Sequence, residues 1–343
     1  MNVRVVPADA LEPHEVEHWS ALQQARPLYR SPFFRPEFTL AVARVREVRI
    51  AIVERGGYFP FEVGHARAGR PVGRPFCDYH GPVLDDPAAH DPRDLVRACG
   101  LSTWSFDHVP AELTPFAPSA SADARSPCVD LAEGFEAYLA VRRAHSDVRG
   151  ALRKARKLAR EVGPLRFVAQ TDDPELFAQA IEWKRRQYAA TGVRDVLGDA
   201  GGRELVGHVY AARSAGFACV LSVLYAGDAV AGLHLALRSG AVWHSWFPAF
   251  NPDLRQYSPG MVLMLELARA APSLGIREID LGKGEARYKQ ALATGSVAVL
   301  EGTVGAGALS ALPVRAQAAG RRALRAAGVH RAVRRALRRR RPR

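Results

Sequence analysis

One segment in the last third of the chain combines residue types that suit the binding of an anionic group. Ser258, Pro259 and Gly260 stand at the start of an apolar run, residues 260–271, that is typical of a helix. Serine is favoured just before the first helical turn, and proline at its first position. The amides at a helix start carry partial positive charge, and glycine lets a ligand come close to the backbone. The same residues also fit a well-capped core helix, so both interpretations stay open.

Further side chains around this segment are candidates for chemistry or substrate binding. Asp280 ends a predicted strand, where it suits either a base that takes a proton from an ammonium group or a cap of the strand end. His244 and Trp246 lie on an earlier strand and would line a cleft or fill a core. Asp78 and Tyr79 follow a strand in the first third of the chain, where they suit either binding of an acceptor's hydroxyls or amine, or a turn.

The cysteines give no sign of a metal site. Cys77, Cys99, Cys128 and Cys219 are far apart and form no CxxC pair. Such a spacing is typical of reduced, buried thiols in a reducing compartment. We therefore expect no bound metal. The chain also contains no Walker loop and no Ser/His/Asp nucleophile elbow.

The elements that would position these residues follow one order twice along the chain. Each copy is predicted as a hairpin with a glycine turn, then a loop, a helix and a strand. The copies span residues 49–107 and 219–281, and they share few identical residues. The repeat is therefore one of architecture, and a single larger mixed sheet is the alternative.

The order of motifs in the second copy resembles that of a known family. Trp246 and Pro252 precede Ser258-Pro259-Gly260, and the helix leads to Ile279-Asp280-Leu281-Gly282-x-Gly284 and then to Tyr288-Lys289. This series is similar to the C-terminal half of FemAB/CelD-like acyltransferases, a branch of the GNAT superfamily. The first half resembles them in Ser31-Pro32-Phe33-Phe34 and Asp78-Tyr79-x-Gly81-Pro82. The resemblance covers roughly residues 15–304.

The resemblance implies a role for several of these residues. It places Ser258 and Gly260, flanked by Arg255 and Met261, at the phosphate-binding turn of the acyl donor, although the usual glycine-rich turn is reduced here to one glycine. Two further roles concern the leaving group and the donor. Tyr288 would protonate the leaving thiolate, which suits a hydroxyl with an ordinary pKa of about 10. Lys289 would lie near the donor.

The same resemblance implies the fold and the reaction. We expect an α/β protein with mixed sheets, built from two tandem GNAT-like domains and a basic C-terminal tail. The predicted parts are an N-terminal half (1–133), a basic linking helix (134–164), a C-terminal half with the catalytic cleft (165–304) and an Arg-rich tail (305–343). The predicted activity is transfer of an acyl group from acyl-CoA to an amine of a sugar, a polysaccharide precursor or a small metabolite.

Two alternatives stay open for the function. The first is a Fem-type transferase that uses aminoacyl-tRNA, favoured by the basic runs and the reduced phosphate turn. The second is a non-catalytic regulator or scaffold with the same fold. A basic run inside the chain, residues 142–160, contains eight Lys or Arg and one acidic residue. It fits phosphates of a nucleotide-linked substrate, an RNA backbone, or a solvated linking helix.

The net charge of +13 comes almost entirely from the end of the chain. Residues 314–343 contain twelve arginines and no acid, so 13 − 12 leaves +1 for the rest. Three apolar residues four apart (Val329, Val333 and Leu337) make this tail a weak basic amphipathic helix. Anionic lipid, RNA and solvent are its candidate partners. The N-terminus does not fit a signal peptide, and no apolar run spans a bilayer, so we expect a cytoplasmic protein, peripheral at the membrane if the tail binds lipid.

Removal of residues 314–343 should leave turnover of a soluble substrate nearly unchanged and weaken binding to anionic vesicles or RNA, because the rest of the chain is nearly neutral. Vesicle sedimentation and RNA gel shift of the full and shortened chains would measure this. Loss of folding on truncation would show instead that the tail is structural.

Overall fold

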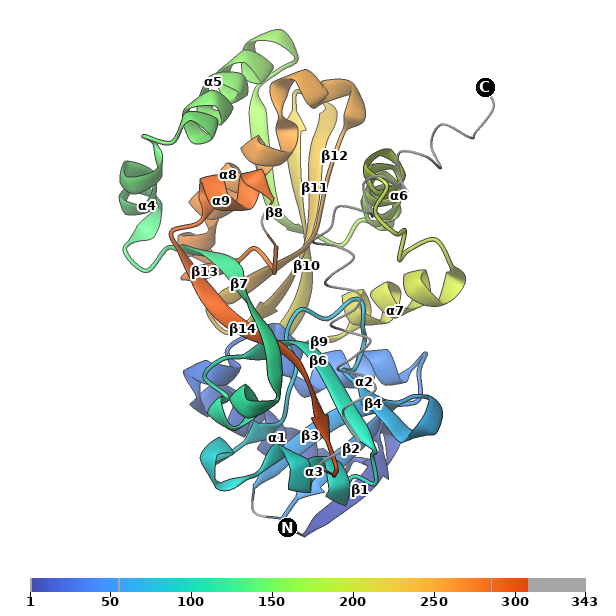
Figure 1. Ribbon diagram of the computed structural model, residues 1–343. Helices are drawn as coiled ribbons and strands as arrows, with labels where there is room; N and C mark the ends of the chain where they lie inside the picture. Colours follow the sequence, from blue (N-terminus) through green and yellow to red (C-terminus); the bar gives the residue numbers. More distant parts are fainter. Residues whose placement is uncertain (1, 55, 285, 308–343) are drawn as a thin grey trace, which may run out of the picture.

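The computed structural model describes residues 2–54, 56–284 and 286–307. In this part of the chain, helices cover a single mixed sheet of 14 strands, so the α/β prediction is confirmed. The chain forms two lobes that share this sheet (Figure 1). The N-terminal elements lie in one lobe and the helices of residues 134–211 lie in the other (Figure 1).

The N-terminal lobe contains most of the elements before residue 131. They are β1 (Val3–Pro7), α1 (Pro13–Ala25), α2 (Pro36–Ala43), β2 (Arg49–Val53), β3 (Gly57–Val63), β4 (Ala68–Arg70), β5 (Val83–Leu84), α3 (Pro92–Ala98), β6 (Thr103–Pro110) and β7 (Ala120–Asp130).

The C-terminal lobe contains most of the elements that follow. They are α4 (Gly134–Arg142), α5 (Ser146–Glu161), β8 (Leu165–Thr171), α6 (Pro174–Thr191), α7 (Ala200–Ala211), β9 (Arg213–Ser214), β10 (Phe217–Ala226), β11 (Ala229–Ser239), β12 (Val242–Phe250), α8 (Pro259–Ala270), β13 (Glu278–Asp280), α9 (Arg287–Leu292) and β14 (Gly295–Gly305).

The predicted repeat is present in both lobes. Strands β2 and β3 form the first hairpin, and β10 and β11 form the second. In each copy a third strand follows, then a helix, and then a strand that runs parallel to the third one. These parallel pairs are β4 with β6 and β12 with β13. Two hairpin–helix–strand units are therefore confirmed.

The expectation of two separate sheets was wrong, because the two copies exchange their last strands. Strand β7, from the first copy, pairs with β13 of the second. Strand β14, from the end of the described chain, pairs with β6 of the first copy and with β7. Both strands cross between the lobes (Figure 1). The sheet is therefore continuous, and neither copy has a complete set of strands by itself.

Helix α6 is capped by Asp173, whose carboxylate accepts from the amides of Glu175 and Leu176. Two local predictions needed correction. The basic stretch is two helices, α4 and α5, and not one. Strand β7 was missed, since its sequence contains few large apolar residues and a proline. Its partner strands supply the pairing that its own composition does not predict.

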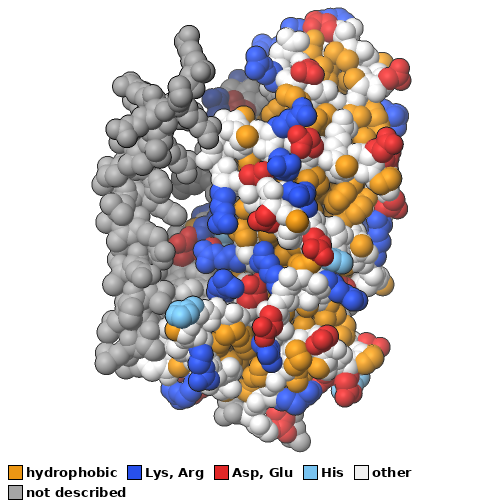
Figure 2. Space-filling model, turned by 90° about the vertical axis from the view of Figure 1, so that its right-hand side faces the viewer, with side chains coloured by type: hydrophobic (Ala, Val, Ile, Leu, Met, Phe, Trp, Pro, Cys, Tyr) orange, Lys and Arg blue, Asp and Glu red, His pale blue; other side chains and the backbone are white. Residues whose placement is uncertain are grey.

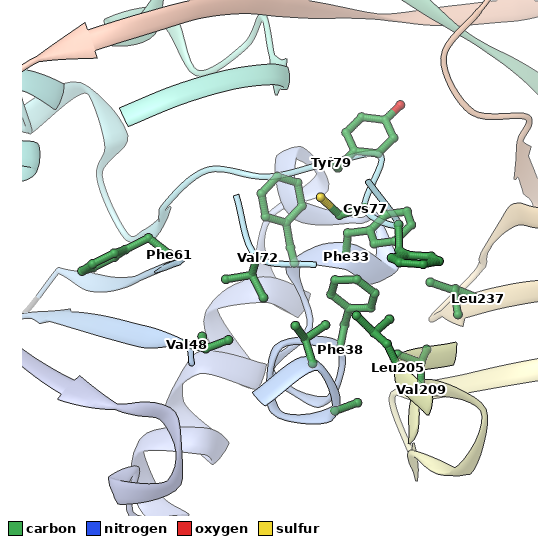
Figure 3. Close-up of a cluster of buried hydrophobic side chains, with 14 of the residues drawn as sticks. Phe33, Phe38, Val48, Phe61, Val72, Cys77, Tyr79, Leu205, Val209 and Leu237 are labelled. Atoms are coloured by element: carbon green, nitrogen blue, oxygen red, sulfur yellow. The ribbon is translucent and has the colours of Figure 1, made fainter. Parts of the chain in front are cut away.

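The core also crosses the boundary between the two copies. Phe33 and Phe38 from the N-terminal lobe pack in one buried cluster with Leu205, Val209 and Leu237 from the C-terminal lobe (Figure 3). Burial of a side chain of this size contributes roughly 1.5–3 kcal/mol. This shared cluster fixes the two lobes against each other.

No helix in the described ranges has the length and apolar composition that crossing a membrane requires. The Arg-rich tail lies outside the described residues from 308 onward. The predicted division of the chain into four parts stays a prediction.

The strand exchange can be tested at Gly302, where β14 passes between β6 and β7. A Cβ there would lie 2.2 Å from the carbonyl oxygen of Ser119 and 2.6 Å from the ring of Phe106. Gly302→Ala should therefore lower the free energy of unfolding by about 1–3 kcal/mol in urea titrations. Gly207→Ala in α7, where a Cβ meets no atom within 4 Å, is the control and should be neutral or stabilising. Equal stability of the two variants would contradict the exchange.

Candidate active site

The sheet opens where β12 and β13 part. The two strands run parallel over three residue pairs, of which the last joins His244 and Asp280. Strand β13 ends there, whereas β12 continues to Phe250. Within the described residues, the edge of β12 that faces β13 therefore has no strand neighbour beyond His244. A loop from the N-terminal lobe, which contains Asp78 and Tyr79, reaches this opening.

Asp280 is buried and has both carboxylate oxygens occupied. Its Oδ1 accepts from the Ser126 hydroxyl and from the Gly282 amide, each at 2.7 Å. Its Oδ2 accepts from the Tyr79 hydroxyl at 2.5 Å. These bonds stabilise the ionised carboxylate and connect β7, β13 and the loop before β5. The arrangement suits a residue that positions its neighbours and argues against the predicted role as a base.

Asp78 is the more accessible carboxylate of the pair. Its Oδ2 lies 2.9 Å from Nε2 of His244, and its Oδ1 lies 3.6 Å from Nε2 of His108. Burial raises the pKa of Asp78, but the hydrogen bond and charge of His244, with the charges of His108 and Lys289, lower it to about 2. The group is therefore a carboxylate at any physiological pH. It can hold a cation, but it is a weak proton acceptor.

Tyr288 and Lys289 lie beside this carboxylate, on α9. Burial and the charge of Asp78 raise the pKa of Tyr288 to about 12, so its hydroxyl keeps its proton at neutral pH. The Lys289 ammonium donates to the carbonyls of Gly282 and Lys283, both at 2.9 Å. Burial lowers the pKa of Lys289, while Asp78 and Asp280 oppose the shift. Tyr288 thus fits a proton donor.

An open pocket of about 500 Å³ lies between α5, α8 and α9. Lys154 of the basic run reaches it and donates to the Ser258 hydroxyl at 2.7 Å. The pocket is lined by residues from three helices and the turn before α8: Ser146, Asp147, Gly150, Ala151, Arg153, Lys154, Ser258, Met261, Arg287 and Tyr288. Tyr288 lines this pocket and also lies close enough to Asp78 to feel its charge.

The turn before α8 differs from the predicted cap. Ser258 adopts a left-handed conformation, with φ of 51°, and its hydroxyl caps no amide of the helix. The amides of Met261 and Val262 both donate to the Ser258 carbonyl. The expectation that the amides at this helix start are free was therefore wrong for these two. Gly260 packs closely against Phe250, because a Cβ at Gly260 would lie 3.3 Å from Cδ1 of the Phe250 ring.

Two of the predicted site residues lie away from the side chains around Asp78. Trp246 is buried in the core, and its indole donates to the carbonyl of Phe76 at 2.7 Å. Arg255 is exposed and does not line the pocket. The structure adds Ser126 and His108, for which the sequence carries no signal, and Lys154, which lies in the basic run. The remaining predicted residues meet around the opening: Asp78, Tyr79, His244, Asp280, Tyr288 and Lys289 on one side and Ser258 and Met261 at the pocket.

One further group of titratable residues lies beside Asp78. His80, Asp107 and His108 offer ligand atoms within 4.8 Å of one another. However, Nε2 of His80 accepts from the amides of Asp107 and His108, both at 3.1 Å, so its lone pair is engaged. The Arg74 guanidinium also lies 3.2 Å from the Asp107 carboxylate. These contacts suit a loop anchor better than a cation site.

The comparison with known families supports an enzyme. Residues 146–290 match the family model of the acetyltransferase (GNAT) domain. The chain carries a GNAT acyltransferase domain. It is therefore an N-acyltransferase, and the alternative of a non-catalytic regulator is not supported. The matched segment begins at α5, which the sequence placed in the linking helix, and α5 lines the pocket of this domain.

Solved structures share the fold of this acyltransferase over most of its length. FemX is 10% identical and covers 88% of this chain and 96% of its own, with a TM-score of 0.57. The C-terminal domain of a putative lysylphosphatidylglycerol synthetase from Agrobacterium fabrum is 14% identical, with coverages of 88% and 95% and a TM-score of 0.56. A conserved protein of unknown function from Bacteroides thetaiotaomicron is 10% identical, with coverages of 84% and 98% and a TM-score of 0.55. No curated protein matches the sequence.

Gly282 offers a test of how closely Asp78 is held. A Cβ at Gly282 would lie 2.6 Å from Oδ2 of Asp78, and φ there is 75°. Gly275 has the same φ of 75°, and a Cβ there meets no atom within 4 Å. Gly275→Ala should cost about 1–2 kcal/mol from backbone strain alone. Gly282→Ala should cost more, and it should also displace Asp78.

Urea unfolding of both variants would measure the free energies, and the rate of acyl transfer would report on Asp78. Equal losses of stability with equal activity would show that Asp78 adjusts without cost. That result would contradict a tightly held carboxylate.

Proposed function

We propose that this acyltransferase moves an acyl group from acyl-CoA to an amine of a sugar, a polysaccharide precursor or a small metabolite. The observation that carries the proposal is the position of Tyr288. Its side chain lines the pocket between α5, α8 and α9, and its hydroxyl lies within the field of the Asp78 carboxylate. A donor in the pocket and an amine at Asp78 would therefore meet at one proton donor.

The pocket suits the donor. Arg153 and Lys154 line it with positive charge, whereas Arg287 is already paired with Asp147 through two bonds of 2.7 Å. Ser258 and Met261 supply the start of α8, whose dipole favours negative charge. Phosphates of coenzyme A at this end would direct the acyl thioester toward Tyr288. Arg255, which is exposed, would contact the donor only outside the pocket.

The reaction then needs three groups of this chain. Asp78 holds the acceptor's ammonium group, and Lys289 stabilises the oxyanion that forms when the amine attacks the carbonyl carbon. The carbon–nitrogen bond forms, the carbon–sulfur bond breaks, and the thiolate takes a proton from Tyr288. The acceptor's ammonium nitrogen loses one proton to a base before the attack. It loses a second proton after the attack, and this proton restores the Tyr288 hydroxyl. Asp280, Tyr79 and His244 keep Asp78 in place.

The donor has a second candidate, an aminoacyl-tRNA. Exposed basic residues of α5 extend from the pocket, and they suit a polyanion longer than coenzyme A: Arg149, Arg153, Arg156, Lys157 and Arg160. One structural neighbour is named a lysylphosphatidylglycerol synthetase, a name that implies lysyl transfer. For the Arg-rich tail we propose binding to an anionic lipid surface or to RNA, which would make a cytoplasmic enzyme peripheral at the membrane.

Thermal-shift measurements with acetyl-CoA, longer acyl-CoAs and aminoacyl-tRNA would distinguish the donors. We expect a shift with coenzyme A thioesters that Lys154→Met reduces. Lys157→Met, on the same helix but 51% exposed and paired with Glu161, is the matched control. A shift with tRNA alone would favour the second donor, and no shift with any of them would contradict the pocket assignment.

Tyr288→Phe should lower kcat about 10²–10⁴-fold and change the KM of the donor much less, because phenylalanine keeps the ring and removes only the proton. Lys289→Ala should weaken donor use. Steady-state kinetics with a substrate whose chemical step is rate-limiting would measure both. Activity of Tyr288→Phe within a few-fold of the parent would discard the role of Tyr288, and the fold would be unaffected.

A further inference from the structure

Lys184 is a partly buried lysine that forms no ion pair in the described part of the chain. It lies on α6, on the side that packs against β12. Its Nζ donates to the carbonyl of Pro248 at 3.1 Å, and the ring of Tyr188 lies 5.3 Å from it. Burial of a cation without a carboxylate partner is costly, so such a residue calls for a functional explanation.

The position of Lys184 joins it to the group around Asp78. Pro248 lies on the part of β12 that continues past the His244–Asp280 pair, where β13 has ended. The charge of Lys289 acts on Lys184, and the charge of Asp78 acts on the hydroxyl of Tyr188. The Lys184–Tyr188 pair on α6 and the Asp78–Lys289 pair are therefore close enough for their charges to act on each other.

The groups around Lys184 lower its pKa. Burial lowers the pKa of Lys184 to about 8, and the charge of Lys289 adds to this shift. On β11, burial lowers the pKa of His234 to about 3, so this neighbour is neutral near pH 7. Tyr188, whose pKa burial raises to about 12, is neutral as well. With a pKa of about 8, roughly one Lys184 in ten is a free amine at pH 7.

The other candidate bases are poorly suited. Asp78 stays ionised down to a pH of about 2 and so binds protons weakly. Both oxygens of Asp280 accept hydrogen bonds already. The ring of His244 lies between these two carboxylates, with its Nε2 2.9 Å from Asp78 and its Nδ1 3.6 Å from Asp280. Lys184 differs from these three groups: it has no carboxylate partner among the described residues, and its pKa of about 8 leaves part of it neutral near pH 7.

We propose that Lys184 is the catalytic base that takes the proton from the acceptor's amine. This inference rests on the proposed function. The ammonium group of the acceptor, held at Asp78, transfers one proton to the neutral Nζ of Lys184, which becomes an ammonium. The freed lone pair then forms the carbon–nitrogen bond. The carbonyl of Pro248 and the face of the Tyr188 ring stabilise the new charge on Lys184.

The protonation state of Lys184 can be measured without a substrate. Competitive labelling of the full chain with acetic anhydride from pH 6 to 11, followed by mass spectrometry of peptides, gives the titration midpoint of each lysine. We expect Lys184 to titrate near pH 8, below the ordinary lysine value of about 10.4. A Lys184 midpoint at the ordinary lysine value would overturn the base assignment.

Substitutions separate a base from a structural cation. Lys184→Met and Lys184→Arg should both lower kcat/KM about 10²–10⁴-fold with the donor and amine pair that the parent uses, since arginine cannot accept the proton. Arg186→Met is the control, because Arg186 is 64% exposed on the same helix. Figure 2 shows that side chains of both charges are mixed on the face of the molecule that forms the right-hand side of Figure 1.

The pH dependence of kcat/KM distinguishes a base from a structural cation. The parent's kcat/KM should rise with pH through about 8, and Lys184→Arg should lose this rise. Activity of Lys184→Arg within a few-fold of the parent would overturn the proposal in favour of a structural cation. A parent that transfers no acyl group would contradict the proposed function, and the labelling midpoint would still decide whether Lys184 is a neutral amine.

Discussion

A buried carboxylate must be satisfied by hydrogen-bond donors, and in this protein that requirement joins the two lobes. Asp280 at the end of β13 draws its donors from Ser126 on β7, Tyr79 before β5 and the Gly282 amide. These segments are distant in the sequence, so the carboxylate can be ionised and buried only after the sheet is complete. An uncompensated buried carboxylate would cost several kcal/mol. The site thus depends on the whole fold rather than on the matched domain alone.

The two lobes differ in what fills the space beside their parallel strand pairs. In the C-terminal lobe the opening between β12 and β13 is free to receive a loop, and that loop brings Asp78. The corresponding position in the N-terminal lobe, between β4 and β6, is occupied by His80. Its ring lies 5.8 Å from that of Trp104 and accepts from two backbone amides of β6. The loop of residues 78–80 therefore binds the backbone of β6 through His80 and brings Asp78 to the opening beside β12.

The charges around the opening are arranged so that neighbouring groups hold different protonation states at one pH. His244, His108 and Lys289 stabilise the ionised form of Asp78, while burial keeps the hydroxyl of Tyr288 protonated. Burial without a counter-charge moves Lys184 the other way, toward the free amine. Groups whose pKa values are pushed apart in one site are suited to separate roles as cation holder, acid and base.

The sequence by itself determined the local elements and the family. Glycine turns between apolar strands predicted the hairpins at 49–63 and 219–237, which the structure contains. The order Ser258-Pro259-Gly260, Asp280, Tyr288-Lys289 indicated a GNAT-type enzyme, which the domain match confirms. It also indicated Asp78 and Tyr79, although not their partners. Only the tertiary structure decided which residues meet, because pairing of β7 with β13 depends on strands far apart in the chain. A sequence does not show which side chains are buried. In the structure Trp246 lies in the core, and Asp280 is a buried acceptor of three hydrogen bonds. Burial also lowers the pKa of Lys184, which in the sequence is one of several basic residues on a helix.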